Sequence, residues 1–183
     1  MKGGVRTTKL FLITCVLTLL LSSAGFATPP EISITGQVEL EAFLGTGTSP
    51  LHTRTITFVA TGGASPATWN LTLTNTAGAV FDYTLTDVPE GTNGLSAKTA
   101  WSLRRKQSVT FDSNNQATVD FTGSSKLLGG DINNSNSVNI FDYALMKVNW
   151  GHGGVADING DGDTNILDYT IMKSNWFKKG DAQ

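Results

Sequence analysis

Four aspartates lie within the twelve-residue segment DINGDGDTNILD, residues 157–168, of a 183-residue chain in which only 15% of the residues are charged. Carboxylate and amide side chains hold positions 1, 3, 5, 7, 9 and 12 of this segment: Asp157, Asn159, Asp161, Asp163, Asn165 and Asp168. Ca²⁺ prefers about six to eight oxygen ligands, and this spacing turns side-chain oxygens, with a backbone carbonyl at position 7, toward one centre. Gly162 at position 6 permits the sharp turn. A solvated acidic loop would not explain this alternation, so the segment predicts a calcium site.

A weaker copy of this segment lies 26 residues upstream, where residues 131–142 read DINNSNSVNIFD. Eleven residues of the stretch 131–150 are identical to their counterparts in 157–176, which identifies an internal repeat. The equivalent ligand positions hold Asp131, Asn133, Ser135, Ser137, Asn139 and Asp142. We expect two direct carboxylate ligands here and three in the second copy, hence two calcium sites of which the second is tighter. Asn136 replaces the glycine, and asparagine tolerates the left-handed backbone of such a turn.

Each loop runs into one helical segment, NIFDYALMKVNW after the first and NILDYTIMKSNW after the second. The stretches before the loops, TGSSKLLGG and GHGGVA, are rich in small residues and do not predict a preceding helix. We expect Trp150 and Trp176 to cap the core that the two helices share. Because that core is small, bound metal should supply much of its folding free energy, and the metal-free module should be largely disordered.

Paired units of one calcium loop and one helix resemble a dockerin type I domain. The resemblance covers residues 129 to about 178 and rests on Gly130-Asp131-x-Asn133 in the first copy and on Asp157-x-Asn159-x-Asp161-Gly162 in the second. It implies a small all-α module with two EF-hand-like loops, called F-hands, that docks onto a cohesin-type extracellular protein. It also implies a link to extracellular polysaccharide degradation or surface assembly. The residues that it implies in partner binding are Ile140, Phe141, Lys147, Ile166, Leu167 and Lys173.

The apolar residues of the two helical segments have two interpretations. Large apolar residues flanked by lysines at duplicated positions are typical of an interface centre with a charged rim. Alternatively, Phe141, Leu145 and Val148 follow a helical spacing and would form an internal core with Leu167 and Ile171. The sequence leaves both interpretations open.

Residues 31–122 follow a different pattern, in which seven short segments carry apolar residues at every second position and are separated by Gly, Pro and Asn. This alternation predicts strands, and their number predicts an all-β antiparallel sandwich. We expect its core to contain Val38, Leu40, Phe58, Leu71, Leu73, Phe81, Tyr83, Leu85, Trp101, Phe111, Val119 and Phe121. Within it, Leu85, Val88, Pro89 and Gly91 resemble the strand end of prealbumin-like, carboxypeptidase-regulatory-like sandwiches.

Residues 1–27 predict a secretory signal peptide. Lys2, Arg6 and Lys9 precede an apolar run, and Ala27 ends a stretch of small residues suited to cleavage. The run is shorter than the roughly 20 residues that cross a bilayer, so we expect secretion without a membrane anchor. The only cysteine, Cys15, would leave with this leader, which excludes thiolate catalysis and disulfides. Cleavage would change the formal net charge from −2 to −5, which disfavours nucleic-acid binding.

The predicted organisation is therefore a signal peptide at 1–27, a β-sandwich at 28–122, a linker at 123–130 that is flexible by composition, and a dockerin-like module at 131–178. No nucleophile and base pair suggests catalysis, and we predict that the protein is not an enzyme.

Two features of the sandwich bear on other functions. Glu39 and Glu41 share one strand face, as a glycosidase pair could, but they alternate with apolar residues and so indicate a polar outer face. A carbohydrate-binding sandwich carried by the docking module is the alternative function, with polysaccharide as ligand. It requires Trp69 or Trp101 on an exposed, flat face.

Overall fold

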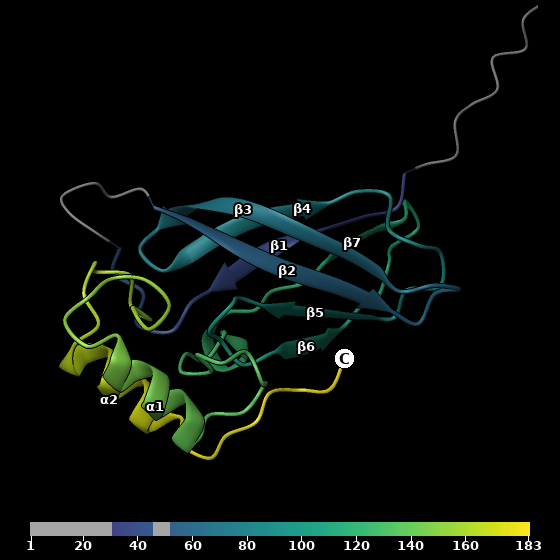
Figure 1. Ribbon diagram of the computed structural model, residues 1–183. Helices are drawn as coiled ribbons and strands as arrows, with labels where there is room; N and C mark the ends of the chain where they lie inside the picture. The colour runs from purple at the N-terminus through teal and green to yellow at the C-terminus, as the bar shows by residue number, and fades with distance from the viewer. Residues whose placement is uncertain (1–30, 46–51) are drawn as a thin grey trace, which may run out of the picture.

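A computed structural model describes residues 31–45 and 52–183, so the predicted signal peptide lies outside the described residues. Figure 1 shows a β-sheet with two short helices below it. The strands are β1 (Ser33–Glu39), β2 (Thr53–Thr61), β3 (Ala67–Ala77), β4 (Val80–Leu85), β5 (Gly94–Lys98), β6 (Arg105–Ser108) and β7 (Gln116–Thr118). They are hydrogen-bonded in the order β6-β5-β2-β3-β4-β1-β7.

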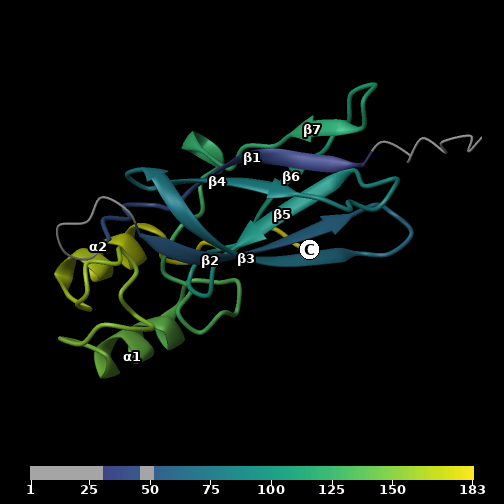
Figure 2. The same cartoon turned by 90° about the horizontal axis from the view of Figure 1, so that it is seen from above.

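This sheet differs in two respects from the expected antiparallel sandwich. Strand β3 pairs with β2 along most of its length and, across a register shift between Asn75 and Ala77, with β4, so that it joins both halves into one continuous sheet. Strand β7 runs parallel to β1, and Figure 2 shows it beside β1 on the side away from α1. Alternation in the sequence reports the face that a residue occupies, not the direction of the neighbouring strand.

One apolar core belongs to the sheet. The expected residues Val38, Leu40, Phe58, Phe81, Tyr83, Leu85, Val119 and Phe121 are buried in it. The rings of Phe58 and Tyr83 lie 4.4 Å apart, centroid to centroid, although β3 separates their strands in the sheet order. The Tyr83 hydroxyl donates to the carbonyl of Val119 at 2.6 Å, as a buried hydroxyl must find a partner. Leu71, Leu73 and Phe111 are only partly buried against this core, and Trp101 lies elsewhere.

The helices are α1 (Ile140–Val148) and α2 (Ile166–Ser174). Each begins with a capping box, in which an N-cap asparagine accepts from the helix backbone while the N3 aspartate accepts from the backbone N–H of that asparagine. Asn139 and Asp142 form the first box, and Asn165 and Asp168 the second. Neither helix in the described part of the chain is long and apolar enough to span a membrane.

The helical module packs directly on the sheet module through a second apolar core. Leu103, which follows β5 in sequence, is buried in this core with Met146 of α1 and Met172 of α2, and Trp101 packs against it. The expected core position of Trp101 in the sheet is therefore wrong. The position of Trp101 depends on how the two modules pack against each other, which the alternation of residues within one strand does not predict.

The predicted flexible linker, residues 123–130, is also packed. It contains a 3-10 helix (Gly123–Ser125), and Leu127 is buried in the sheet core and forms a bridge with Leu40. Its glycine and serine content predicted flexibility, but backbone bridges of Leu127 with Leu40 and of Gly129 with Ser102 hold it in place. Leu103 N–H donates to the carbonyl of Leu128 at 2.8 Å, which aligns the linker with the segment after β5.

Candidate calcium loops and docking face

The second loop, residues 157–168, brings carboxylates together as its spacing predicts. Asp157, Asp161 and Asp168 each offer an oxygen, and these oxygens all lie within 4.8 Å of one another. Asp157 Oδ2 accepts from the N–H of Gly162 at 3.0 Å, whereas its Oδ1 is buried without a hydrogen-bond partner. A buried carboxylate oxygen without a donor is costly unless a cation balances it. The second loop therefore fits the charge and the oxygen chemistry of Ca²⁺.

The pKa values of two carboxyls in this loop are shifted in opposite directions. Burial raises the pKa of Asp168, against backbone N–H donors from Asn159, Asn165 and Ile158, and the charge of Asp157 raises it further. Partial burial also disfavours the charged form of Asp161, but hydrogen bonds from neighbouring groups outweigh it and lower the pKa of that carboxyl. The inner side of the loop is thus a crowded anionic site.

The remaining predicted ligands of the second loop support its shape. Asn159 is buried, and its side-chain oxygen accepts from Asp161 N–H at 2.9 Å. Asn165 uses its side-chain oxygen to cap α2 through Leu167 N–H at 2.8 Å and directs its amide toward the carbonyl of Asp163 at 3.2 Å. Asp163 itself is exposed, in keeping with a backbone ligand.

The first loop, residues 131–142, holds two carboxylates, and one of them, Asp131, is paired with a cation of the protein. Asp131 Oδ1 accepts from Ser135 N–H at 2.7 Å, and its Oδ2 accepts from Asn136 N–H at 2.8 Å and from the ammonium of Lys98. Asp142 accepts from the N–H groups of Asn133 and Asn139 at 3.0 and 2.8 Å. Ser135 Oγ lies 3.2 Å from the carbonyl of Ser137. The first loop therefore fits a divalent cation poorly.

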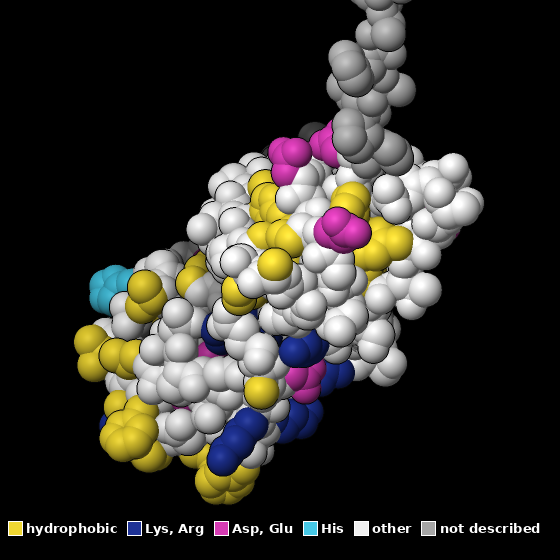
Figure 3. Space-filling view, turned by 90° about the vertical axis from the view of Figure 1, so that its right-hand side faces the viewer, with side chains coloured by type: hydrophobic (Ala, Val, Ile, Leu, Met, Phe, Trp, Pro, Cys, Tyr) yellow, Lys and Arg dark blue, Asp and Glu magenta, His cyan; other side chains and the backbone are white. Residues whose placement is uncertain are grey.

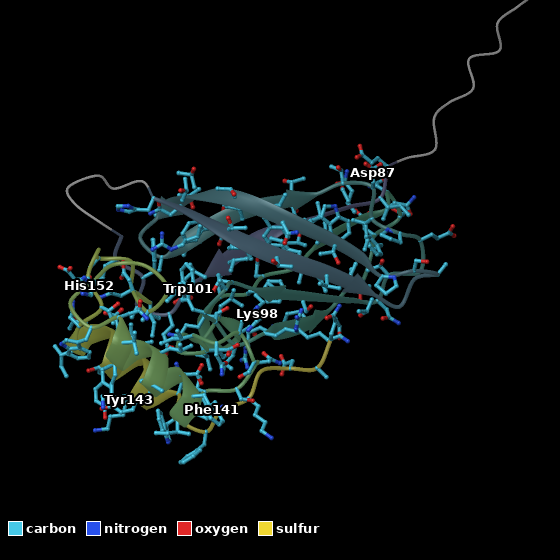
Figure 4. All side chains as sticks on the ribbon, viewed as in Figure 1. Asp87, Lys98, Trp101, Phe141, Tyr143 and His152 are labelled. Carbon is cyan, nitrogen blue, oxygen red and sulfur yellow. The ribbon has the colours of Figure 1, made fainter. Side chains whose placement is uncertain are left out.

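Lys98 of β5 is the positively charged side chain at the first loop, and no sequence pattern predicted its position there. Its ammonium donates to Asp131 and to the carbonyl of Ser102, and both charged side chains are nearly buried. Burial lowers the pKa of Lys98, the hydrogen bond to Asp131 raises it, and the charge of Arg104 lowers it further. Figure 4 shows Lys98 and Trp101 where the sheet approaches the helical module.

Both loops need the left-handed backbone at two positions. Gly160 and Gly162 have φ of +72° and +107°, and the first loop places Asn134 and Asn136 at +60° and +64°. The tolerance expected of Asn136 is confirmed. Position 4, occupied by Asn134 in the first loop and Gly160 in the second, also has a left-handed backbone. Asparagine and glycine are the residues that tolerate this conformation best.

The predicted partner-binding residues lie on the exposed side of the two helices. Ile140, Phe141, Ile166 and Leu167 are 58%, 68%, 60% and 50% exposed, and Lys147 and Lys173 are exposed as well. The internal-core interpretation fails for Phe141, Leu145, Val148 and Leu167, and holds for Ile171, which is buried. Trp176 packs on the helical core as expected, whereas Trp150 is 46% exposed. At the lower end of Figure 3, hydrophobic side chains protrude beside lysine and arginine side chains.

Two hollows of about 450 and 500 Å³ flank the ring pair of Tyr143 and Tyr169, whose centroids are 5.9 Å apart. Both tyrosines line both hollows. The other lining residues of the first are Lys147, Trp150 and Ile166, and those of the second are Lys173, Trp176 and Ile140. A shift of 26 residues converts one set into the other, so the internal repeat produces a pair of equivalent hollows.

The carboxylates and tryptophans considered for other functions have structural contacts. Glu39 accepts from Gly123 N–H at 2.7 Å, and Glu41 accepts from Gly129 N–H at 3.1 Å and from the side-chain amide of Asn175. Trp69 is partly buried against the sheet core. The guanidinium of Arg54 covers the ring of Trp101 at 5.5 Å. Both tryptophans are only partly exposed.

Residues 129–175 match the family model of the Dockerin type I domain. The fold resembles a chain of an N-terminal interface mutant of a type II cohesin-X-dockerin complex from Acetivibrio cellulolyticus, with 18% identity and a TM-score of 0.55, over 81% of this chain and 97% of that chain. A C-terminal interface mutant of the same complex gives 17% identity and a TM-score of 0.52 over the same shares. At this identity the likeness concerns the fold, a β module followed by a dockerin-like helix pair. No curated protein matches the sequence.

Proposed function

We propose that this chain is a non-catalytic docking protein, whose helical module binds a cohesin-type partner through the exposed face of α1 and α2. The single observation that carries the proposal is the apolar surface on this face. Phe141, Leu145 and Val148 are 68%, 38% and 79% exposed at a spacing that aligns them along α1. An apolar surface of this kind on a small module is typical of an interaction site.

The two hollows beside Tyr143 and Tyr169 add further apolar surface to the helix pair, lined by residues other than Phe141, Leu145 and Val148. Each combines an apolar wall of tryptophan and isoleucine with one lysine, a combination that suits an apolar partner side chain next to an acidic one. The likeness to chains from cohesin-X-dockerin complexes and the family match over residues 129–175 support a cohesin as the partner.

Calcium belongs to this proposal through the second loop. Asp157, Asp161 and Asp168 would hold the ion, with Asn159, Asn165 and the backbone of Asp163 as further oxygen donors. Bound Ca²⁺ would neutralise the carboxylates next to the start of α2 and so hold Ile166 and Leu167 in place on the docking face.

The test is a binding measurement between the chain without residues 1–27 and purified type I and type II cohesins, with calcium and with a chelator. We expect a complex with one cohesin class that forms in calcium and weakens at least tenfold in chelator. The double variant Phe141→Ser with Val148→Ser should weaken it at least tenfold. Leu44→Ser removes a 62% exposed leucine of the sheet module and serves as the matched control. Absence of binding to both cohesin classes in calcium would contradict the proposal.

Secretion through the leader at 1–27 and a role in extracellular polysaccharide degradation or surface assembly form part of the same proposal. A cohesin-bound protein of this kind would need an extracellular partner. The carbohydrate-binding alternative has no supporting contact at Trp69 or Trp101, and a pull-down on insoluble polysaccharides tests it directly.

A further inference from the structure

The first aspartates of the two loops face different groups. Asp131 receives a lysine ammonium from β5, together with two backbone N–H donors. Its counterpart Asp157 receives one N–H, and its other oxygen is buried without a donor. The same position in the repeat is therefore satisfied by protein groups in the first loop and left open for a cation in the second.

The charged groups around the two loops also favour a cation in the second loop over the first. Lys98 forms an ion pair with Asp131 of the first loop, and Arg104 lines the same hollow of about 380 Å³ as Lys98 and Ser135. A divalent cation would enter there against two positive charges, at a loop whose carboxylates are half neutralised.

The second loop also has a cation nearby, Arg54: burial lowers the pKa of its guanidinium, and the charge of Asp157 raises it. The guanidinium of Arg54 lies over the ring of Phe43 at 4.6 Å and donates to the carbonyl of Thr53 at 3.0 Å, with no hydrogen bond to a carboxylate. Among the described residues, Arg54 thus forms no ion pair with the four aspartates of residues 157–168, whereas Lys98 forms one with Asp131 at the first loop.

The backbone of the first loop is fastened to the sheet module as well. Asp131 N–H donates to the carbonyl of Trp101 at 3.1 Å. The side-chain oxygen of Asn136 accepts from Arg104 N–H at 2.8 Å, and its amide donates to the carbonyl of Asp181 at 3.0 Å. Asparagine at position 6 therefore supplies contacts that a glycine could not.

We propose that this chain takes one Ca²⁺, in the second loop, and that the sheet module holds the first loop folded without metal, with Lys98 supplying the positive charge. The inference differs from the expectation of two filled sites. It rests on the calcium binding proposed above for the second loop. The first loop then acts as a permanent joint between the modules, and only the second responds to calcium.

The first test is the calcium stoichiometry of the chelated chain without residues 1–27, by isothermal titration and by native mass spectrometry. One equivalent is expected, and none for the double variant Asp157→Asn with Asp161→Asn. Two equivalents for the parent chain would overturn the inference and leave the proposed docking function intact. No equivalents would overturn both the inference and the proposed calcium site.

The second test is hydrogen exchange of single amides in chelator, read by NMR on the same chain. The N–H groups of Ser135 and Asn136 should stay protected, while that of Gly162 should exchange at least tenfold faster than in calcium. Lys98→Met should speed exchange at Ser135 and Asn136 at least tenfold, and Lys106→Met, which removes an exposed lysine of β6, should not. Equal loss of protection in both loops of the parent chain, or no effect of Lys98→Met, would overturn the inference.

Discussion

The carboxylate of Glu41, just beyond β1, accepts a hydrogen bond from the side-chain amide of Asn175, the C-cap of α2, across 134 positions of sequence. The same Glu41 oxygen accepts from the backbone N–H of Gly129, and Asn175 donates to the carbonyl of Gly129 at 2.8 Å. One carboxylate thus connects the sheet, the segment between the modules and the end of the last helix.

Replacing Glu41 by alanine should loosen the helical module from the sheet. Asn175 is buried, so its amide would lose a charged acceptor that water cannot easily replace. We expect a loss of about 1–3 kcal/mol in the free energy of unfolding. Urea denaturation followed by tryptophan fluorescence measures it, with Glu90→Ala, at an exposed turn, as the control. Equal effects of the two substitutions would show that the Glu41 contact contributes nothing.

Substitution of Asn136 by glycine should destabilise the chain, although glycine is the residue that the second loop uses at this position. The left-handed backbone would be relieved, but the hydrogen bonds to Arg104 N–H and to the Asp181 carbonyl would be lost. We expect a net cost of about 1 kcal/mol, measured by thermal denaturation. Asn134→Gly changes the same backbone region without these contacts and should stay within about 0.5 kcal/mol. Stabilisation by Asn136→Gly would contradict the proposed role of its side chain.

Alanine substitutions at the two N-cap asparagines should distinguish the contribution of helix capping from that of calcium binding. Alanine at Asn139 or at Asn165 removes an equivalent cap and should cost about 1 kcal/mol in either helix in the absence of calcium. Only Asn165→Ala should also weaken calcium binding, because Asn165 belongs to the loop that we propose binds the ion. Calorimetric titration of both variants checks this, and a matching loss of calcium affinity in Asn139→Ala would argue for a filled first loop.

Calcium should raise the thermal stability of the chain, and the gain should come from the second loop. At free calcium about a thousandfold above the dissociation constant, one site adds about 4 kcal/mol to the free energy of unfolding. Scanning calorimetry with calcium and with chelator measures the shift. The variant Asp157→Asn with Asp161→Asn should melt at the same temperature in both conditions, and a persistent shift would place the ion elsewhere.

The docking face should be dominated by α1. Val148 is 79% exposed, whereas the equivalent position of α2 is Ser174, and Leu145 corresponds to Ile171, which is buried. Val148→Ser should therefore weaken cohesin binding by about tenfold or about 1.4 kcal/mol, and Ser174→Val should leave it unchanged. Affinities measured by surface plasmon resonance in calcium decide this. Equal effects at the two positions would indicate that both helices contribute alike.

Local pattern was sufficient for several features of this chain. Seven strands, two helices and their approximate ranges follow from the periodicity of apolar residues between 31 and 176. The meeting of Asp157, Asp161 and Asp168 follows from their spacing, because a twelve-residue loop confines them whatever the rest of the chain does. The capping boxes are local as well, but Asn139 and Asp142 were interpreted only as ligands, although asparagine followed three residues later by an acid is also a helix start.

Other features depended on contacts between residues far apart in sequence. The parallel pairing of β7 with β1, the packed segment 123–130 and the place of Trp101 in the helical core all follow from how the sheet closes and where the helices meet it. None of these contacts can be predicted from the periodicity of the sequence. Alternation of apolar and polar residues indicates which side chains are buried, but not which segment they pack against.

The two loops, their repeat and the apolar positions on the helices could be predicted from the sequence, because each depends on residues close to one another along the chain. The contact of Lys98 with Asp131, 33 positions away, and the position of Arg54 over Phe43 without an ion pair to Asp157 depend on tertiary packing. The physical reason is that a loop's own residues fix where its oxygens point. The charge that those oxygens meet comes from whichever segment packs against them.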